Sequence, residues 1–361
     1  MGAAEFPLWK KTSEIASRLG AVAGVNGDFT TVRGAPTHVT MVDGELWTSG
    51  RVSGSAFGIS AAGQRAFASR PKLSMRLTRA KGKGLLRVAE WNVGLPRRGT
   101  VKGYTRRGGK VARPPGAMHP DGSDPIYCAA RLEPVKGEGY VWSGAHETSI
   151  TRRYRVDAQP EPCRKIRLAR GPVPGAVVLA ARAGTKGARR IVALRRGRRV
   201  RMWWTLEGWP GVTDVIGASQ VLLHRGDNVA PPDREGAGHI LESNPRTAVG
   251  VSKSCSDARP RTGCKVFIVT VDGRQPSWSK GMMLPRLARE LKRAGAWNAI
   301  NLDGGNSTTA WVRRTRRAYC QEPATVRGCF VNRPSHDGER LVIEALTALS
   351  GGDPGTPRGL K

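Results

Sequence analysis

The stretch AINLDGGNSTTAWV, residues 299–312, decides how the rest of the chain is interpreted. Apolar residues lead up to Leu302, the chain breaks at Asp303, Gly304 and Gly305, and apolar character returns at residues 310–312. An Asp-Gly pair between two apolar runs is typical of a β-hairpin turn. Residues 303–309 nevertheless contain an acid, two glycines, an amide and three hydroxyls. This excess of polar groups favours a binding or catalytic loop at the end of a strand.

The overall composition indicates a globular protein. The chain has 361 residues, of which 39% are hydrophobic, so it can build the core of one large domain or of two ordinary ones. Its longest apolar runs, such as residues 176–181, have the length of a strand. They fall far short of the ~20 residues that a membrane-spanning helix needs. We therefore expect no membrane span.

Positive charge dominates the chain, with 60 Lys and Arg against 28 Asp and Glu and a formal net charge of +32. Such a charge attracts nucleic acids, anionic polymers and anionic lipids without selecting among them. It is densest in RRGRRVR, residues 195–201, and RRTRR, residues 313–317. We interpret both as solvated strand faces and hairpin tips, with a true anion-binding patch as the alternative. No nucleic-acid-binding motif accompanies them, so we expect no specific nucleic-acid partner.

The six cysteines indicate disulfide bonds rather than a metal cluster. Two spacings are short and equal, and each encloses turn residues, which suits a bond that closes a compact loop. The third bond follows by elimination, although six cysteines allow many other pairings. The expected pairs are Cys255–Cys264, Cys320–Cys329 and Cys128–Cys163. This arrangement indicates an oxidising compartment, although residues 1–20 lack the apolar core of a secretion signal.

Strand and turn patterns outnumber helical ones. We expect helices over residues 12–19, capped by Thr12 or Ser13, and over residues 283–294, with Gly295 after its end. Residues 38–50 and 57–68 are each typical of a hairpin, and so is the pair of segments 247–255 and 264–274. The expected fold is a single intertwined α/β (α+β) domain over residues 1–350, with mixed, largely antiparallel sheets and a few packed helices. Residues 106–125 are expected to form a surface insertion and residues 351–361 a flexible tail.

Four polar clusters stand at strand ends or sharp turns. They are VNGDFT (residues 25–30), SNPRTAVGVS (243–252), TVDGR (270–274) and NLDGGNSTT (301–309). Each one alone is typical of a turn. In this order, with GAWNAINLDGG forming the last strand and loop, they resemble the phosphodiester glycosidase family. The similarity runs from about residue 13 to about residue 346.

The resemblance implies a hydrolase that cleaves a sugar-1-phosphodiester, with an N-acetylglucosamine-like sugar, into free sugar and a phosphomonoester. It also implies a secreted or cell-envelope protein, and a sugar-phosphate conjugate or anionic glycopolymer as its partner. Family members carry further strands before the helix that precedes VNGDFT, so we expect that this chain lacks an N-terminal part. The resemblance implies no firm cofactor, a divalent metal stays open, and the sequence does not define an oligomeric state.

The reaction suggests roles for the clusters. Because phosphate leaves readily, such an enzyme mainly needs a cation on the phosphate and stabilisation of the positive charge that develops on the sugar. Arg246 is our candidate for the phosphate clamp because a guanidinium matches phosphate oxygens. Asp303 is the candidate nucleophile or base, with a purely structural turn as the alternative, and Asp28 is the second acid. The expected substrate-binding residues are Asn26, Gly304, Gly305, Asn306, Ser307, Thr308 and Asp272, although Asp272 with Arg274 also reads as a structural turn.

Two positions depart from the family pattern. Asn306 stands where the usual DGGGS loop has its third glycine, and because Asn tolerates positive φ best among the other residues, we expect the backbone shape to survive. Thr30 stands where the family has a second phenylalanine. These departures support a second hypothesis, a non-catalytic carbohydrate- or polyanion-binding module of the cell envelope.

Overall fold

The computed structural model of the protein describes most of the chain. The described residues are 6, 8–31, 34–51, 54–61, 63–80, 82–108, 126–144, 146–157, 163, 174–232, 241–256, 263–313, 320–323, 328–335 and 338–349. Of the expected surface insertion, only residues 106–108 are among them, and the expected tail lies outside the described residues.

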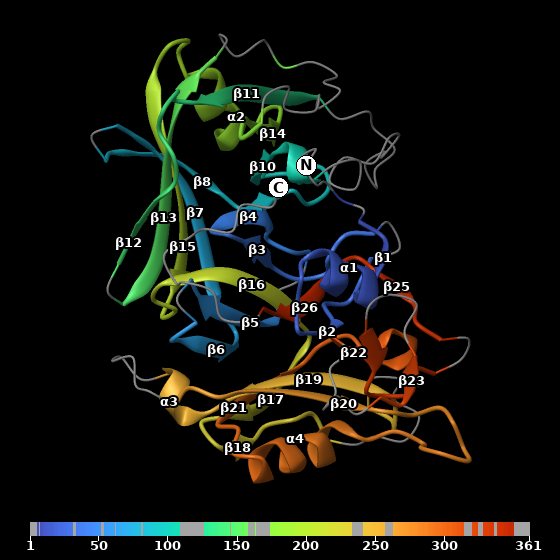
Figure 1. Ribbon diagram of the computed structural model, residues 1–361. Coiled ribbons are helices and arrows are strands. Elements are labelled where there is room, and N and C mark those ends of the chain that lie inside the picture. Colours follow the sequence, from blue (N-terminus) through green and yellow to red (C-terminus); the bar gives the residue numbers. More distant parts are fainter. Residues whose placement is uncertain are drawn as a thin grey trace.

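The fold is mainly β, and its strands form five sheets (Figure 1). Within the described residues neighbouring strands are antiparallel, except that β9 runs parallel to β10. The expected antiparallel sheets with a few helices are therefore confirmed. Helix is scarcer than the α/β class implies, because most connections between strands are short turns rather than helices.

The largest sheet has nine strands in the order β8-β7-β15-β13-β11-β14-β10-β9, with β12 beside β13. It stands upright on the left in Figure 1 and turns over at the top. Its strands are β7 (Lys72–Arg79), β8 (Gly84–Val88), β9 (Glu90–Trp91), β10 (Val101–Tyr104), β11 (Tyr127–Pro134), β12 (Val141–Ser143), β13 (Glu147–Val156), β14 (Val177–Arg182) and β15 (Arg199–Glu207).

Three further sheets have five strands each, and the polar clusters belong to the second and third of them. The first contains β3 (Thr40–Val42), β4 (Glu45–Thr48), β5 (Ser55–Ser60), β6 (Ala66–Ser69) and β16 (Val212–Ala218). The second contains β17 (Gln220–His224), β18 (Asp227–Asn228), β19 (Arg246–Val251), β20 (Val266–Val271) and β21 (Asn298–Asn301). The third contains β2 (Ala23–Asn26), β22 (Ala310–Arg313), β23 (Glu322–Pro323), β24 (Gly328–Phe330) and β26 (Ala345–Ala348). A small sheet pairs β1 (Lys10–Lys11) with β25 (Leu341–Val342).

Short helices lie between the strands. The α-helices are α1 (Thr12–Arg18), α2 (Lys186–Val192), α3 (Lys253–Ser256) and α4 (Leu284–Arg293), and the 3-10 turns are η1 (Arg106–Gly108) and η2 (Gly305–Ser307). The helix α4 lies below the β17–β21 sheet in Figure 1 because Leu284, Leu287 and Leu291 form one buried stripe against it. The helices predicted over residues 12–19 and 283–294 are confirmed as α1 and α4. Gly295 follows α4 with φ 101°. The expected cap of α1 is wrong, because Lys11 is its N-cap residue and Ser13 instead binds Glu339.

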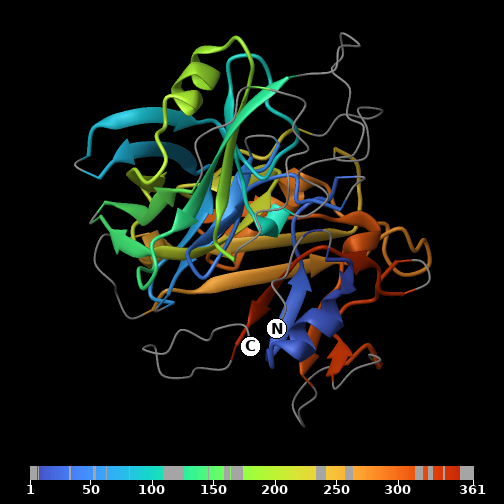
Figure 2. The same cartoon turned by 90° about the horizontal axis from the view of Figure 1, so that it is seen from above.

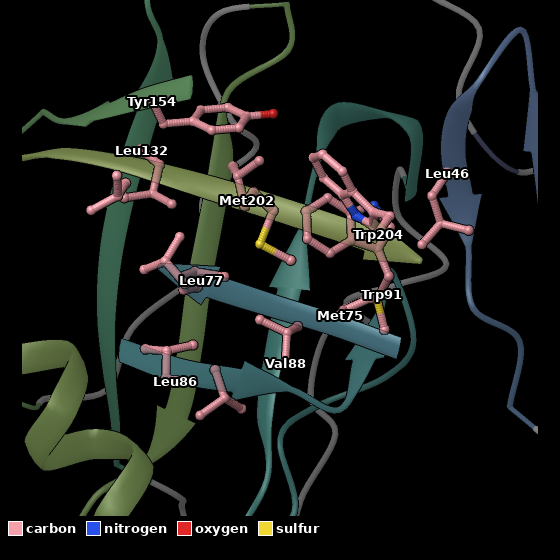
Figure 3. Close-up of a cluster of buried hydrophobic side chains, with 14 of the residues drawn as sticks. Leu46, Met75, Leu77, Leu86, Val88, Trp91, Leu132, Tyr154, Met202 and Trp204 are labelled. Atoms are coloured by element: carbon pink, nitrogen blue, oxygen red, sulfur yellow. The ribbon is translucent and has the colours of Figure 1, made fainter. Parts of the chain in front are cut away.

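The main hydrophobic core lies between the nine-stranded sheet and the sheet of β3 to β6 and β16. Figure 3 shows Met75, Leu77 and Met202 on neighbouring strands pointing into it beside Trp91 and Trp204. The rings of Trp91 and Trp204 meet edge to face, with centroids 5.3 Å apart. Large aromatic and thioether side chains bury much apolar area per residue. This layer therefore contributes much of the hydrophobic stabilisation of the fold.

The three expected disulfides are present, as Cys128–Cys163, Cys255–Cys264 and Cys320–Cys329, and no free cysteine remains among the described residues. Such bonds form and persist in oxidising compartments. The bond between Cys255 and Cys264 joins α3 to the start of β20. Among the described residues, no helix is both long and apolar enough to cross a membrane.

Candidate active site

The polar clusters meet where two of the five-stranded sheets end. The NGD turn follows β2, the DGG loop follows β21, the NPR segment leads into β19, and the DGR turn follows β20. Figure 1 shows β2, β22 and β26 directly above β19. Segments that lie far apart in the sequence therefore contribute their loops to one region of the molecule.

Gly27 links two segments of this region through backbone hydrogen bonds. Its N–H donates to the carbonyl oxygen of Glu344 over 3.1 Å, and its own carbonyl accepts from the N–H of Asp303 over 3.0 Å. A Cβ at this position would come within 2.7 Å of the Glu344 side chain. Only glycine fits, because any side chain would push apart the two strands that present Asp303 and Glu344.

Asp303 is partly buried, and its surroundings favour the neutral acid. Burial is the main reason that its pKa rises to about 6, and the carboxylate of Asp28 adds to the rise. The hydroxyl of Ser307, the N–H of Gly304 and the charge of Arg340 act in the opposite direction. The Gly304 N–H donates to the Asp303 carboxylate over 2.8 Å. Asp303 therefore combines a turn-holding contact with a pKa close to neutrality.

Asp28 is held inside the protein. The exposed fraction of its side chain is 0%, and its carboxylate accepts from the backbone N–H of Phe29 and of His38, each over 2.7 Å. The ring nitrogen Nδ1 of His38 lies 2.7 Å from the same carboxylate. The contacts of Asp28 therefore hold the backbone at Phe29 and His38 in place. Its role as a second catalytic acid stays a prediction.

Glu344 is a third carboxyl group in this region. It accepts from the Asp28 N–H over 3.1 Å and from the Thr40 hydroxyl over 3.0 Å. Burial and the neighbouring Asp28 charge raise the pKa of Glu344 to about 8. At neutral pH this carboxyl group is therefore mainly protonated, whereas Asp303 is mainly ionised.

The side chain of Asn26 hydrogen-bonds to three segments of the site. Its amide donates to the Asp303 carbonyl over 2.7 Å and accepts from the Thr247 hydroxyl over 2.7 Å and the Thr309 N–H over 3.2 Å. The residue is fully buried. These contacts occupy most of the amide, so the clearest function of Asn26 is to hold the ends of β2, β19 and β21 in register.

Arg246 lies deeper than a phosphate clamp requires, with 3% of its surface exposed. Its guanidinium donates to the carbonyl of Met282 over 3.0 Å and to that of Glu242 over 2.6 Å. Burial, with the nearby charge of Arg274, lowers the pKa of Arg246 to about 10. Its role as the clamp stays a prediction, while its contacts show that it organises the NPR segment.

Arg274 presents a second guanidinium at the surface beside the DGG loop. Two of its nitrogens donate to the Asn244 amide oxygen over 3.1 and 2.9 Å, and the third donates to the Asn306 amide oxygen over 2.9 Å. Arg274 has a φ of 57°, a left-handed backbone conformation that is strained for a non-glycine residue. Its orientation is therefore fixed by two amides on either side.

Asn306 does not adopt a positive φ, so the survival of the family's loop shape stays a prediction. Among the described residues, the only non-glycines with positive φ are Asp43, Asn92, Arg225 and Arg274, so Asn306 is not one of them. Gly305 has the positive value, 60°. Asn306 instead uses its side chain, whose amide oxygen also accepts from the Ser335 hydroxyl over 3.2 Å.

The two glycines of the loop allow it to lie on the NPR segment. The Gly305 N–H donates to the Pro245 carbonyl over 2.9 Å. A Cβ on Gly304 would lie 2.6 Å from that same oxygen. The hydroxyls of Thr308 and Thr309 are buried without a hydrogen-bond partner in the described structure, which leaves two donors unused at the base of the loop.

Asp272 connects the DGG loop to an exposed tryptophan. Its carboxylate accepts from Asn332, whose amide also donates to the Thr308 carbonyl, and from the N–H of Arg333. The other carboxylate oxygen accepts from the indole N–H of Trp278 over 2.9 Å. The ring of Trp278 is 52% exposed. Asp272 therefore positions an aromatic surface, and its direct binding of substrate stays a prediction.

No group of three or more His, Cys, Asp or Glu in the described part of the chain could hold a metal ion.

Sequence reasoning missed three of the groups found here. His38 and Glu344 stand in strand-like sequence without any motif, and only the fold brings them to Asp28. Trp278 lies in QPSWSK, where the adjacent Pro and Ser indicate an exposed turn. That pattern was the one available signal that this tryptophan differs from those in the core.

Comparison with known proteins supports the family. A profile of the phosphodiester glycosidase family matches residues 157–348, more than half of the 361-residue chain. No curated protein sequence matches the chain.

Three solved structures are similar to this one. A hypothetical protein from Synechocystis has 19% identity and a TM-score of 0.57, over 85% of this chain and 50% of that one. This chain therefore spans about half the length of that relative. A putative exported protein from Burkholderia pseudomallei has 22% identity and a TM-score of 0.59, over 97% and 70% of the two chains. The catalytic domain of zebrafish N-acetylglucosamine-1-phosphodiester alpha-N-acetylglucosaminidase, auto-inhibited by its pro-peptide, has 15% identity and a TM-score of 0.42, over 95% and 68%.

At these identities the structural likeness shows a shared fold, and the profile match supplies the assignment. The match contains the NPR segment, the DGR turn and the DGG loop, which the structure brings together. The chain belongs to the phosphodiester glycosidase family.

Proposed function

We propose that the protein hydrolyses a sugar-1-phosphodiester to free sugar and a phosphomonoester. The observation that carries the proposal is the Asp303 carboxyl, with a pKa of about 6, in a loop that backbone hydrogen bonds to Gly27 and Pro245 hold beside the guanidinium of Arg274. A carboxyl group with a pKa near neutrality can serve as base or nucleophile in a hydrolytic site. Membership of the family supports the same reaction.

Asp303 carries the reactive negative charge in this proposal. Its carboxylate either removes the proton from the attacking water or attacks the sugar carbon itself. In both cases the bond between the sugar carbon and the phosphate oxygen breaks, and the phosphate keeps the electron pair. The leaving group is stable as an anion, so it needs little help from an acid.

Glu344 contributes by staying neutral. A diester substrate is an anion, and a further charged carboxyl in this region would repel it. The proton on Glu344 removes that repulsion, while the Asp28 side chain is buried and accepts hydrogen bonds from the backbone N–H groups of Phe29 and His38.

Arg274 and Arg340 supply the positive charge for the phosphate. Both are exposed, and the charge of Arg340 acts on Asp303. Arg274 is held in place by Asn244 and Asn306, so little side-chain freedom is lost when it binds an anion. Arg246 stands behind Arg274 and maintains a positive field at the loop.

Trp278 supplies the surface for a sugar ring or for the group beyond the phosphate. Its indole is exposed and fixed by Asp272 beside Arg333, whose guanidinium lies 5.9 Å from the ring centre. A fixed aromatic face packs against the apolar face of a sugar at small entropic cost. The N-acetylglucosamine-like sugar named by the family resemblance is our first choice of substrate.

We further propose that the protein works outside the cytoplasm. The three disulfides require an oxidising compartment. The similar Burkholderia protein is described as exported. An anionic glycopolymer of the cell envelope is the corresponding natural substrate class.

The direct test is release of free sugar from soluble sugar-1-phosphodiesters. Uridine diphosphate N-acetylglucosamine and an aryl phosphodiester of N-acetylglucosamine are suitable substrates, with free sugar measured by chromatography. Wild-type protein should release sugar, and Asp303→Asn should reduce the rate by about 10³-fold or more. Asp227→Asn is the matched control because Asp227 is exposed on β18.

Two results would contradict the proposal. An unchanged rate in Asp303→Asn would remove Asp303 from the chemistry. Binding of the conjugates by wild-type protein without any turnover would instead favour the non-catalytic carbohydrate-binding module. Circular dichroism and the melting temperature confirm that each variant is folded before its rate is compared.

A further inference from the structure

The nine-stranded sheet carries a concentration of arginine far from the candidate site. Alternate residues of β7, β8, β13 and β15 are exposed. These strands lie on the left of Figure 1, on the other side of the molecule from β2 and β22. We name this surface the arginine face. It consists of Arg76, Arg87, Arg155, Arg199, Arg201 and Trp203.

Like charges stand directly opposite each other on this face. The strand register pairs Arg76 with Arg87, and Arg155 with Arg199. Arg201 stands opposite Arg153, which binds Glu138. Opposed like charges on neighbouring strands destabilise a sheet. Arg155 also stands opposite Glu133 of β11, whereas Arg76 has Arg87 on one side and Trp203 on the other. Among the described residues, the Arg76–Arg87 pair therefore has no acid opposite it.

The five arginines of the face have no acidic partner within the described part of the chain. Glu133, which stands opposite Arg155, forms its ion pair with Arg131, and so does Asp157. At the opposite end of the face, Glu207 approaches Lys72 to 3.9 Å. Within the described part of the chain, no ion pair therefore neutralises the arginines of the face.

A cavity of about 400 Å³ extends the positive region at one end of the strands. It is lined by Arg79, Ala80, Lys83, Arg198 and Arg199, so Arg199 belongs both to the cavity and to the face. Strands in a sheet are about 5 Å apart, and alternate residues along a strand about 7 Å apart. The guanidinium groups thus form a two-dimensional array, which a single small anion cannot neutralise but a chain of anions can.

The environment of Trp203 indicates which class of polyanion the face can bind. Arg76 and Arg201 lie over the Trp203 ring, 5.1 and 5.6 Å from its centre. The indole N–H donates to the Thr78 hydroxyl over 3.1 Å. Proteins that bind single-stranded nucleic acid stack bases on open aromatic rings. Trp203 is covered by guanidinium groups, so it orders the arginines and offers no open ring to a base.

We propose that the arginine face binds a polymer of phosphodiester-linked polyols of the poly(glycerol phosphate) type, through its phosphates and without base stacking. The array of charges, the absence of acidic partners among the described residues and the covered Trp203 ring together select this ligand class. The face holds a polymer at a distance from the candidate active site, and its binding does not depend on the proposed hydrolysis.

The test measures binding of a long poly(glycerol phosphate) chain by fluorescence anisotropy at several salt concentrations. The triple variant Arg87→Gln, Arg199→Gln, Arg201→Gln leaves Arg76 on Trp203. We expect it to weaken binding by about tenfold or more and to reduce the slope of log Kd against log salt by about 2. Free glycerol phosphate should bind too weakly to detect.

The matched control removes the same charge elsewhere. Arg286, Arg289 and Lys292 are exposed on α4, and their replacement by Gln should weaken binding by less than about twofold. Equal losses in the two triple variants would show that net charge alone is responsible, and would overturn the proposal. Tighter binding of poly(dT) than of poly(glycerol phosphate) with the same number of phosphates would overturn it in favour of nucleic acid, and no binding by wild-type protein would overturn it outright.

Two readouts keep the result interpretable. The melting temperature of the face variant should rise slightly, because removing Arg199 and Arg87 relieves opposed like charges. If the triple variant fails to fold, Arg87→Gln and Arg199→Gln alone should each weaken binding about two- to threefold, and no loss in either would overturn the proposal. Hydrolysis of a small soluble sugar-1-phosphodiester should be unchanged, so failure of this proposal and of the proposed hydrolysis are separable.

Discussion

At the scale of single residues, the site depends on how each acid is surrounded. The charge of Asp28 acts on both Asp303 and Glu344, yet each of the three acids has a different environment. Asp28 receives three hydrogen bonds, Glu344 is kept protonated, and Asp303 is left near neutrality. The protein thereby produces three different chemical groups from one functional group.

The pH profile of hydrolysis should follow these two raised pKa values. Activity should rise as pH increases through about 6, where Asp303 ionises, and fall above about 8, where Glu344 acquires a repelling charge. Glu344→Gln keeps a neutral side chain of the same shape, so it should retain activity and lose the alkaline fall. The measurement is kcat/KM from about pH 4 to about pH 10, a range that brackets the ordinary and raised carboxyl pKa values. An alkaline fall that persists in the variant would assign it to another group.

Trp278 should affect substrate binding more than chemistry. Trp278→Ala removes the exposed ring and should raise KM about tenfold with a smaller change in kcat, because stacking is worth roughly 1–1.5 kcal/mol. Trp142 on β12 is similarly exposed, at 49%, and Trp142→Ala is the control that should leave both constants unchanged. An equal effect on kcat and on kcat/KM would instead indicate a contact made only in the transition state.

At the scale of elements, the DGG loop is fixed by its contact with the NPR segment. Gly304→Ala would place a methyl group 2.6 Å from the Pro245 carbonyl oxygen. The loop must then shift or break the bond from Gly305 to Pro245, so the free energy of unfolding should fall by about 1–3 kcal/mol, and hydrolysis should be lost. Gly84→Ala on β8 meets no atom within 4 Å and is the control. Denaturant unfolding measures both, and equal stability of the two variants would contradict the described loop contact.

Local elements were predictable from sequence where a pattern repeats or a turn type demands particular residues. The Asp43-Gly44 turn has φ 49° and 74°, as an Asp-Gly hairpin requires, and it joins β3 to β4. The helix α4 followed from its leucine stripe. Single residues such as Glu344 were not predictable, because their surroundings come from strands that pair only in the folded chain. The burial of Arg246 was missed for the same reason, since an arginine before a strand normally reaches solvent.

At the scale of the whole molecule, strands from distant parts of the sequence alternate within each sheet. β16 lies between β3 and β5, and β2 lies between β22 and β26. Because each of these sheets needs early and late segments of the chain, we propose that residues 1–350 fold as one domain. The site then forms only when the chain closes, as Gly27 meets Asp303 and Glu344.

The net charge should make the stability of the whole molecule depend on salt. With a formal charge of +32, repulsion between positive groups opposes folding. Ion pairs such as Arg107–Glu45 act in the other direction, but arginines of the arginine face have no such partner among the described residues. Screening by salt should therefore remove more repulsion than attraction, and the melting temperature should rise by a few degrees between about 0.05 M and about 0.5 M sodium chloride. The triple arginine-face variant should show a smaller rise, and a melting temperature that falls with salt would mean that ion pairs outweigh the repulsion.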